Sequence, residues 1–189
     1  MKLEQTADGS YTLYVPELDE HYHSVKGALT ESQHIFIEMG LKHSPVSEPH
    51  ILEIGLGTGL NAFLTLLSAE ETRRKVHYTG IERYPLAEET LKQLDYPRLI
   101  GKQHEEDYYA IHRAPWNTET EVSPWFTLHK IEDDFTRLFN PEEGSCPTVP
   151  LYDIIYFDAF APEKQPEMWE QSLFDTLYKV FNEGGILTT

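Results

Sequence analysis

The stretch Ile51-Leu52-Glu53-Ile54-Gly55-Leu56-Gly57-Thr58-Gly59-Leu60-Asn61 decides the fold class of this chain. The apolar run at 51–54 predicts a short buried strand, and the apolar periodicity of 60–69 predicts a helix. Glycines between a strand and a helix permit positive φ angles and let a ligand approach the backbone. Their spacing is G-x-G-x-G, which differs from the G-x-G-x-x-G of dinucleotide-binding proteins. We therefore expect a ligand-binding turn here, with a plain tight turn as the alternative.

Strands and helices alternate after this turn. Further strands are predicted at 76–81, 126–131, 151–157 and, at least in part, 186–189. Helices are predicted at 85–94, with Pro85 in its first turn, and at 166–182, which Gly184-Gly185 would end. The side chains expected to face inward from the latter helix are Trp169, Leu173, Phe174, Leu177, Val180 and Phe181. This alternation predicts an α/β fold with a doubly wound, largely parallel sheet.

The chain is expected to have two parts, an N-terminal extension at 1–48 and the sheet domain at 49–189. Two connecting segments stand out in the second part. The polar segment 102–125 is compatible with an insertion or a lid, and 141–150 with a surface loop. Because the sequence ends in an apparent strand, we expect the sheet domain to be truncated at its C-terminal end.

The N-terminal extension is predicted to contain a hairpin and a helix. Residues 3–6 and 11–15 flank Asp8-Gly9, which favours a β-hairpin, and 19–28 is expected to be a loop. Thr30 and Gln33 have the spacing of a capping box at a helix start. The helix would end at Gly40 and bury Ile35, Phe36 and Met39.

Composition narrows the class of protein. Hydrophobic residues make up 40% and charged residues 25% of the 189 residues, which favours one globular domain over disorder. No apolar run is long enough for a membrane span, and the first residues lack the apolar core of a signal peptide. The single cysteine, Cys146, allows no internal disulfide or thiolate metal cluster, and its loop context predicts an inert thiol. A cytoplasmic location is therefore expected.

Charge and histidine content also bear on partners. A formal net charge of −17 favours a small cationic substrate over nucleic acid, although it can hide a local basic patch. His21 and His23 are two residues apart but have no evident third ligand, so no metal site is expected.

Acidic residues follow the predicted strands at the edge where parallel sheets bind ligands. Glu53 precedes the glycine turn and suits a cationic ligand such as S-adenosylmethionine. Glu82 ends the second strand, where a carboxylate can accept hydrogen bonds from both ribose hydroxyls. One acid of Glu132-Asp133-Asp134 could accept the adenine amine, although a solvated charged loop fits equally well.

The fourth strand ends in Asp158-Ala159-Phe160-Ala161-Pro162. Asp158 could orient an amine nucleophile and disperse its developing charge, or it could be a structural strand-end residue. Phe160 could stack on a base or lie against a sulfonium. Met168 and Trp169 are expected to belong to the core.

Together these motifs resemble the methyltransferase domain of the MnmC family. The resemblance rests on residues 55–61, 82–86, 158–162, 166–169 and Leu173-Phe174, and in the N-terminal part on Tyr22, His23, Ser24, Gly27, Glu31 and Phe36. It covers the chain from about His21 onward. The Asp-Ala-Phe-Ala-Pro and Pro-Glu-Met-Trp pair is its specific component, because many methyltransferases share the glycine turn.

The resemblance implies a class I methyltransferase with a Rossmann-like sheet that transfers a methyl group from S-adenosylmethionine to the 5-aminomethyl group of the wobble uridine in tRNA. Asp158 and Phe160 would be the catalytic residues. The cofactor would be held by Glu53, Gly55, Gly57, Thr58, Gly59, Asn61, Glu82, Arg83, Asp133 and Asp134. The chain would be the stand-alone form, without the flavin-dependent oxidoreductase domain to which some family members are fused. Family members also continue beyond the fifth strand, into a basic segment that is missing here.

Two other functions remain open. An aminopropyltransferase of the spermidine synthase type would share the fold, the glycine turn and a strand like residues 152–158, and its polyamine substrate would suit an acidic protein. A non-enzymatic domain that binds the cofactor weakly, or only packs against a partner, is the second alternative.

Overall fold

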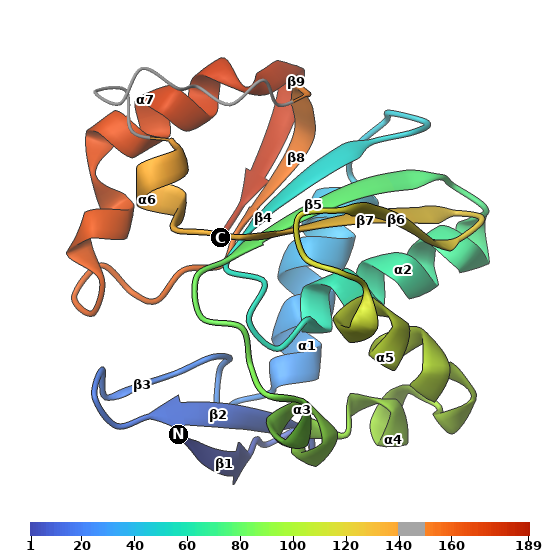
Figure 1. Ribbon diagram of the computed structural model, residues 1–189, viewed down its shortest axis with the longest axis vertical. Coiled ribbons are helices and arrows are strands. Elements are labelled where there is room, and N and C mark those ends of the chain that lie inside the picture. Colours follow the sequence, from blue (N-terminus) through green and yellow to red (C-terminus); the bar gives the residue numbers. More distant parts are fainter. Residues whose placement is uncertain (140–149) are drawn as a thin grey trace.

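A six-stranded sheet forms the centre of the computed structural model, which describes residues 1–139 and 150–189 (Figure 1). The strand order is β6-β7-β5-β4-β8-β9. The strands are β4 (His50–Ile54), β5 (Val76–Glu82), β6 (Glu119–Ser123), β7 (Phe126–Glu132), β8 (Tyr152–Phe157) and β9 (Phe181–Thr188). All neighbours pair in parallel except β6, which is antiparallel to β7. The predicted α/β, doubly wound architecture is confirmed, with its switch of strand order beside β4 and β8.

Helices cover both faces of this sheet, as Figure 1 shows. The helical segments are α1 (Ala28–Ser32), η1 (Gln33–Leu41), α2 (Leu60–Thr72), α3 (Glu88–Leu94), α4 (Tyr96–Ile100), η2 (Lys102–His104), α5 (Glu105–Arg113), α6 (Phe135–Leu138), η4 (Pro166–Trp169) and α7 (Gln171–Lys179). Alternate residues of β4 and β8 enter two separate hydrophobic clusters. One contains Ile51 and Ile154 with α2 and η1, and the other contains Leu52 and Ile155 with α6 and α7. Burial on both faces explains why most residues of these strands are apolar.

A smaller three-stranded sheet precedes the central one. It consists of β1 (Lys2–Gln5), β2 (Tyr11–Val15) and β3 (Glu20–His21), and its β1–β2 pair confirms the hairpin around Asp8-Gly9. The short strand β3 lies in the segment that was expected to be a loop. Leu13 and the following helices pack into the same core as α2. The division of the chain at residue 48 stays a prediction.

The capping-box prediction is wrong, because the helix begins at Ala28 and not after Thr30. The Thr30 backbone N–H and hydroxyl both donate to Asp8 Oδ2, each at 2.9 Å, so an acid of the hairpin satisfies the first turn. Helix η1 then continues with the wider i→i+5 bonding, seen in the 2.9 Å bond from Lys42 N to Ile37 O. This widening turns Ile37 inward and leaves Met39 exposed, against expectation.

Two other predicted helix boundaries are also wrong. Helix α3 begins at Glu88, so Pro85 lies before it. Helix α7 ends at Lys179, and β9 already begins at Phe181. The pair Gly184-Gly185 therefore lies within a strand, where the β8–β9 register shifts between Tyr152 and Ile154. A glycine in a left-handed conformation is typical of a β-bulge, and Gly184 has a φ of 78°.

The polar segment 102–125, for which the sequence left the structure open, is part of the main body. It forms η2, α5 and the antiparallel strand β6, and α5 packs against α2 (Figure 1). The segment therefore supports the helix that follows the glycine turn. The expected loop at 141–150 lies almost entirely outside the described residues, and Cys146 lies outside them too.

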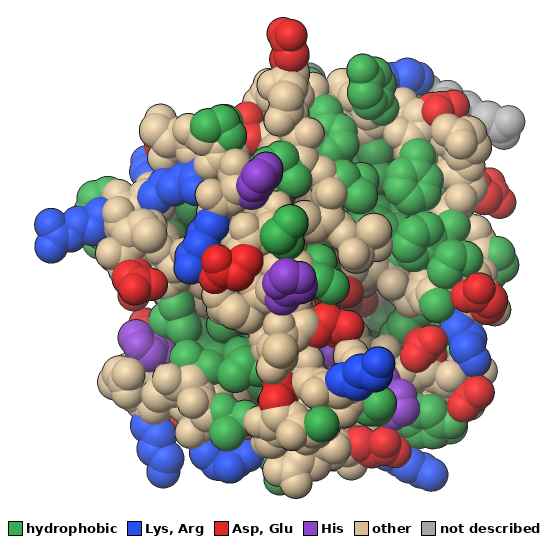
Figure 2. All heavy atoms as spheres, turned by 180° about the vertical axis from the view of Figure 1, so that it is seen from behind, with side chains coloured by type: hydrophobic (Ala, Val, Ile, Leu, Met, Phe, Trp, Pro, Cys, Tyr) green, Lys and Arg blue, Asp and Glu red, His purple; other side chains and the backbone are tan. Residues whose placement is uncertain are grey.

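The surface is mixed in character. Figure 2 shows apolar side chains gathered on one part of the reverse face, on the side of α7 and β9. Large exposed apolar residues of this part of the fold are Leu151, Tyr178 and Leu187. Within 1–139 and 150–189, no helix has both the length and the apolar character to cross a membrane.

Candidate functional site

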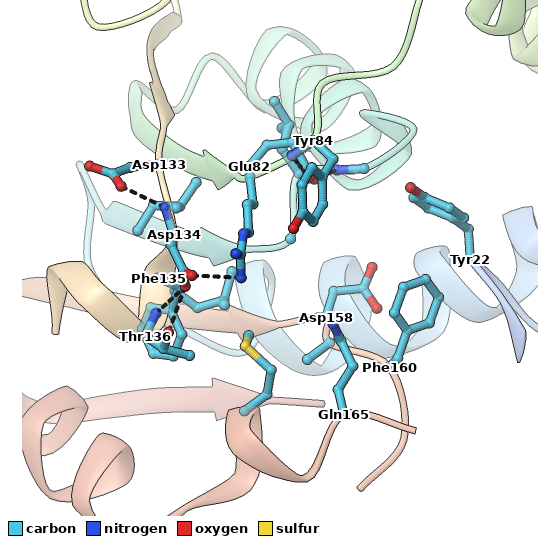
Figure 3. Close-up of a pocket in the computed structure, with 18 of the residues that line it drawn as sticks. Tyr22, Glu82, Tyr84, Asp133, Asp134, Phe135, Thr136, Asp158, Phe160 and Gln165 are labelled. Atoms are coloured by element: carbon cyan, nitrogen blue, oxygen red, sulfur yellow. Dashed lines mark hydrogen bonds and ion pairs between the residues drawn. The ribbon is translucent and has the colours of Figure 1, made fainter. Parts of the chain in front are cut away.

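A cavity of about 360 Å³ opens at the carboxyl ends of β4, β5, β7 and β8 (Figure 3). Parallel sheets bind ligands at this edge, next to the change in strand order. The N-terminal part contributes Leu18, Tyr22 and His23 to the wall opposite the strand ends. The volume lies in the range of cavities that hold small organic ligands.

Most of the residues singled out from the sequence meet in this cavity. Those that line it are Gly55, Gly57, Thr58, Glu82, Arg83, Asp133, Asp134, Asp158 and Phe160. Glu53, Gly59 and Asn61 do not line it. They lie behind the glycine turn, where Glu53 and Asn61 are almost completely buried.

The glycine turn and the loop after β8 touch through their backbones. Gly55 has a φ of 86°, and a Cβ at this position would lie 2.5 Å from the carbonyl oxygen of Asp158. Gly57 has a φ of 49°, and a Cβ there would lie 3.1 Å from the Tyr22 ring. Both positions therefore require glycine, for conformation and for space.

Buried side chains hold the turn from behind. His23 Nε2 and Thr58 Oγ1 are 2.8 Å apart, and Tyr108 on α5 donates its hydroxyl to Thr58 O at 3.0 Å. Burial lowers the pKa of His23 to about 4, so this imidazole is neutral near pH 7. Gly59 packs against His112 of α5, whose ring would lie 2.7 Å from an added Cβ. The turn is thus supported by the N-terminal part and by segment 102–125.

Glu82 connects the end of β5 to the glycine turn. Its Oε2 accepts a hydrogen bond from Gly57 N at 2.8 Å, and its Oε1 accepts one from Tyr84 N at 2.7 Å. Each carboxylate oxygen has a further lone pair. Because Glu82 lines the cavity (Figure 3), it can accept additional hydrogen bonds from a ligand.

The acids after β7 are fixed by their own partners. Asp134 Oδ2 pairs with Arg83 Nη1 at 2.7 Å, and its Oδ1 accepts the Thr136 N–H at 2.9 Å, which caps α6. Asp133 pairs with Arg137 of the same helix. The Arg83–Asp134 pair therefore links the ends of β5 and β7 beside the cavity.

Asp158 ends β8 and faces the cavity at the side opposite Asp133 (Figure 3). Its backbone N–H donates to Ile54 O at 3.0 Å. Although one side of Asp158 is open to the cavity, the surrounding protein raises the pKa of its carboxyl to about 7. The group can therefore take up or release a proton near neutral pH.

Asn61 joins Asp158 to Glu53. Its Nδ2 donates to Asp158 Oδ2 at 2.8 Å and to Glu53 Oε1 at 2.9 Å. Burial, and then the nearby Asp158, raise the pKa of Glu53 well above its usual value. This shift favours the protonated, uncharged form of Glu53. The expectation that it presents negative charge to a cationic ligand does not fit its place in the core.

Two aromatic rings form a corner next to Asp158. Tyr22 and Phe160 meet edge to face with ring centroids 5.4 Å apart. The loop that carries Phe160 is held by a 2.8 Å hydrogen bond from Trp169 Nε1 to Phe160 O. An ion pair of 3.3 Å between Lys164 and Asp19 joins this loop to the N-terminal part.

Sequence reasoning missed several lining residues. They are Leu18, Tyr22, His23, Tyr84, Phe135, Thr136, Gln165, Glu167 and Met168. Tyr22 and His23 belong to the N-terminal residues on which the family resemblance rests, so that signal was available. Met168 was expected in the core, but it both packs there and lines the cavity. No group of three or more metal-ligating side chains occurs in the part of the chain that the structure describes.

Comparisons with known proteins agree with this geometry. A family described as S-adenosyl-L-methionine-dependent methyltransferases matches residues 142–189. The tRNA 5-methylaminomethyl-2-thiouridine biosynthesis bifunctional protein MnmC of Magnetococcus marinus is 30% identical over 182 residues, which are 92% of this chain and 26% of that protein. The MnmC protein of Leptospira borgpetersenii is 26% identical over 185 residues, or 90% of this chain and 27% of that protein.

The fold has a counterpart among solved structures. The crystal structure of MnmC2 from Aquifex aeolicus matches with a TM-score of 0.75 and 24% identity over 99% of this chain and 58% of that chain. The chain thus has the Rossmann-like class I methyltransferase fold, and its resemblance to MnmC is confirmed. It spans about a quarter of the length of the curated relatives. These comparisons give no support to the aminopropyltransferase or non-enzymatic alternatives.

Proposed function

We propose that this chain, a relative of the MnmC proteins, is an S-adenosylmethionine-dependent methyltransferase that acts on the 5-aminomethyl group of the wobble uridine in tRNA. The product would carry a 5-methylaminomethyl group. We place the reaction in the cytoplasm, because its substrate is tRNA. The main support is that Asp158, with a pKa near 7, faces the same cavity as the glycine turn and Glu82.

The chemistry of the donors and acceptors that line the cavity fits the proposed cofactor. Glu82 keeps free lone pairs for the two ribose hydroxyls, and Gly55 and Gly57 leave room for a ligand against the backbone. The Asp133–Asp134 side would take the adenine, and Asp158 and Phe160 would lie near the sulfur. When bound, S-adenosylmethionine supplies an electrophilic methyl group on a positively charged sulfur.

Asp158 would prepare the amine for attack. An alkylamine is mostly protonated in neutral water, so a proton must leave before the nitrogen lone pair can react. The ionised Asp158 carboxylate accepts this proton, or the hydrogen bond of the neutral amine, and passes the proton to solvent through the open side of the cavity. Its fixed position also aligns the nitrogen, and alignment supplies much of the rate in such transfers.

The aromatic corner would position the base. A modified uridine at the cavity mouth can stack on Phe160, while Tyr22 limits the access of water to the amine. Burial, together with Glu82, raises the pKa of Tyr22 to about 12. Tyr22 therefore keeps its hydroxyl proton at all working pH values and adds no charge to this side of the cavity.

A nucleoside assay tests the function. The protein is incubated with S-adenosylmethionine and with tRNA from cells that lack the gene, and the nucleosides are identified by mass spectrometry. Conversion of 5-aminomethyl to 5-methylaminomethyl uridine is expected. A parallel reaction with putrescine and the decarboxylated cofactor would reveal an aminopropyltransferase instead. Binding of S-adenosylhomocysteine without conversion of the tRNA would refute the proposed substrate.

The variant Asp158→Asn tests the catalytic role. The turnover number is expected to fall by about 100-fold or more, which is typical for loss of a general base, while the affinity for S-adenosylhomocysteine stays within about threefold. Asp175→Asn is the matched control, because this aspartate is exposed on α7 and accepts a hydrogen bond from Gln171 of the same helix. Equal turnover in the two variants would remove Asp158 from the mechanism.

A further inference from the structure

We propose that Asn61 is the positioning residue of the active site: its side-chain amide, anchored on Glu53, holds the Asp158 carboxylate toward the cavity from behind. The inference rests on the proposed function only in naming Asp158 as the group that meets the amine. It reassigns Asn61 and Glu53, which the family resemblance placed among the cofactor-binding residues.

The amide of Asn61 contacts two acids and does not line the cavity. Its Nδ2 lies 2.9 Å from Glu53 Oε1 and 2.8 Å from Asp158 Oδ2. Both partners present oxygen acceptors, so the two N–H groups of the amide point one to each acid. Asn61 is only 2% exposed, and it has no direct access to a ligand.

The backbone around Asn61 makes this geometry rigid. Asn61 is the second residue of α2, immediately after the left-handed turn at Gly59. The short side chain has few rotamers, and both of its N–H contacts are to neighbouring strands, Glu53 on β4 and Asp158 at the end of β8. Asn61 therefore connects the glycine turn to the catalytic loop through side chains, in addition to the Gly55 backbone contact.

Glu53 provides the anchor because it is fully buried and its Oε1 accepts the Asn61 amide. Burial, and then the nearby Asp158, raise the pKa of Glu53 well above its usual value, which favours the protonated form. In that form Glu53 holds the amide without adding a second full negative charge next to Asp158. Were Glu53 ionised, repulsion between the two carboxylates would oppose ionisation of Asp158.

The titratable groups that interact with Asp158 lie on several elements. They are Glu31 on α1, Glu53 on β4, Tyr78 on β5 and Tyr96 on α4. Burial raises the pKa of Asp158 most strongly, and Glu31 adds to this rise. The Asn61 hydrogen bond acts in the opposite direction, because it stabilises the carboxylate. Asn61 thereby keeps Asp158 able to ionise near neutral pH.

The variant Asn61→Leu tests the inference, since leucine has a similar size and no donor. We expect the pKa of Asp158 to rise by about one pH unit, as befits loss of one hydrogen bond to a partly solvated carboxylate. A titration of carboxyl-labelled aspartate by NMR measures this without any reaction. At pH 7 the ionised fraction, and with it kcat/KM, should fall about fivefold if the pKa moves from about 7 to 8.

Asn182→Leu is the matched control. Asn182 Nδ2 donates to Asp153 Oδ1 at 2.8 Å, which repeats the Asn–Asp contact at the opposite edge of the sheet. In this variant we expect no change in the pKa of Asp158. The low-pH side of the plot of kcat/KM against pH, called the acid limb below, should also stay unchanged. Circular dichroism and thermal melting verify that the variants are folded, and Asn61→Ser serves as a second donor-poor variant if the leucine side chain prevents folding.

The outcomes separate this inference from the proposed function. An unchanged Asp158 titration in a folded Asn61 variant, or an equal shift in the Asn182 variant, would overturn the positioning role. A shifted titration with no methylation by the wild type would support the positioning role and overturn the proposed function. A shifted titration with a matching shift of the acid limb supports both.

Discussion

The substitution Glu82→Gln tests how the cavity recognises a ribose. The wild-type carboxylate accepts the Gly57 and Tyr84 backbone N–H groups, one on each oxygen. A glutamine offers one acceptor oxygen and one NH2 group. In either orientation of the amide, one of the two N–H groups must therefore face another donor, and the negative charge is lost.

The size of the effect follows from these contacts. A hydrogen bond to a charged group contributes about 1.5–3 kcal/mol, and Glu82 is partly open to solvent, which favours the lower half of that range. A loss of about 2 kcal/mol corresponds to roughly 30-fold weaker binding of S-adenosylhomocysteine. Misplacement of Gly57 and the weaker contact to a ribose hydroxyl act in the same direction.

Calorimetric titration with S-adenosylhomocysteine measures this loss. Glu132→Gln is the matched control, because it removes the same charge. Glu132 lies on β7, directly beside Glu82 in the register of the sheet, but it does not line the cavity. The affinity of Glu132→Gln for S-adenosylhomocysteine should stay within about twofold of the wild-type value, since a solvated charge contributes little to binding. An unchanged affinity in Glu82→Gln, or the same loss in both variants, would show that the carboxylate does not bind the ribose.

Two further predictions concern stability. Gly59→Ala should lower the free energy of unfolding by about 2–4 kcal/mol, because Gly59 has a left-handed φ of 71° and the added methyl group would overlap the His112 ring. Gly184→Ala should lower it by only about 1 kcal/mol, because Gly184 has a similar φ of 78° but open space around it. Chemical denaturation measures both losses, and equal losses would contradict the packing of Gly59 against His112. Because the folded-state pKa of Glu53 is raised, its contribution to stability is greatest below the usual value of 4.5 and is lost as the pH rises. The stability of Glu53→Gln relative to wild type should therefore grow as the pH rises above 4.5, by at most about 1.4 kcal/mol per pH unit, and a difference that does not change with pH would contradict the raised pKa.

The central sheet was predictable because its signals are local. Apolar runs such as 151–157 and the glycine turn at 55–59 report burial and backbone conformation directly, and the structure has strands and a turn at those places. The residues at strand ends, among them Glu82 and Asp158, followed from the rule that parallel strands open to a ligand at their carboxyl edge.

Helix ends were harder to predict because distant residues determine them. Asp8 supplies the first-turn acceptor that the Thr30–Gln33 spacing was expected to provide. The glycines at 184–185 have the composition of a helix stop, but pairing with β8 draws them into a strand. In both cases tertiary contacts, which a local pattern does not contain, override local preference.

The chemistry of Glu53 shows a similar limit. A sequence assigns an acid to a position next to the turn, but only the packing of α2 and β4 shows that the carboxyl is buried and that its pKa is raised. The pairing of Tyr22 with Phe160 likewise depends on how the N-terminal part folds back, which no spacing within either segment encodes.

The contacts between the N-terminal part and the loop after β8 have a consequence for biosynthesis. Tyr22 and Asp19 are made early, whereas their partners Phe160 and Lys164 are added long after them. A nascent chain on the ribosome therefore has only half a binding cleft until the loop after β8 has emerged. Ligand capture should begin abruptly, once that loop has emerged, and from then on bound ligand would oppose unfolding of the domain as a whole.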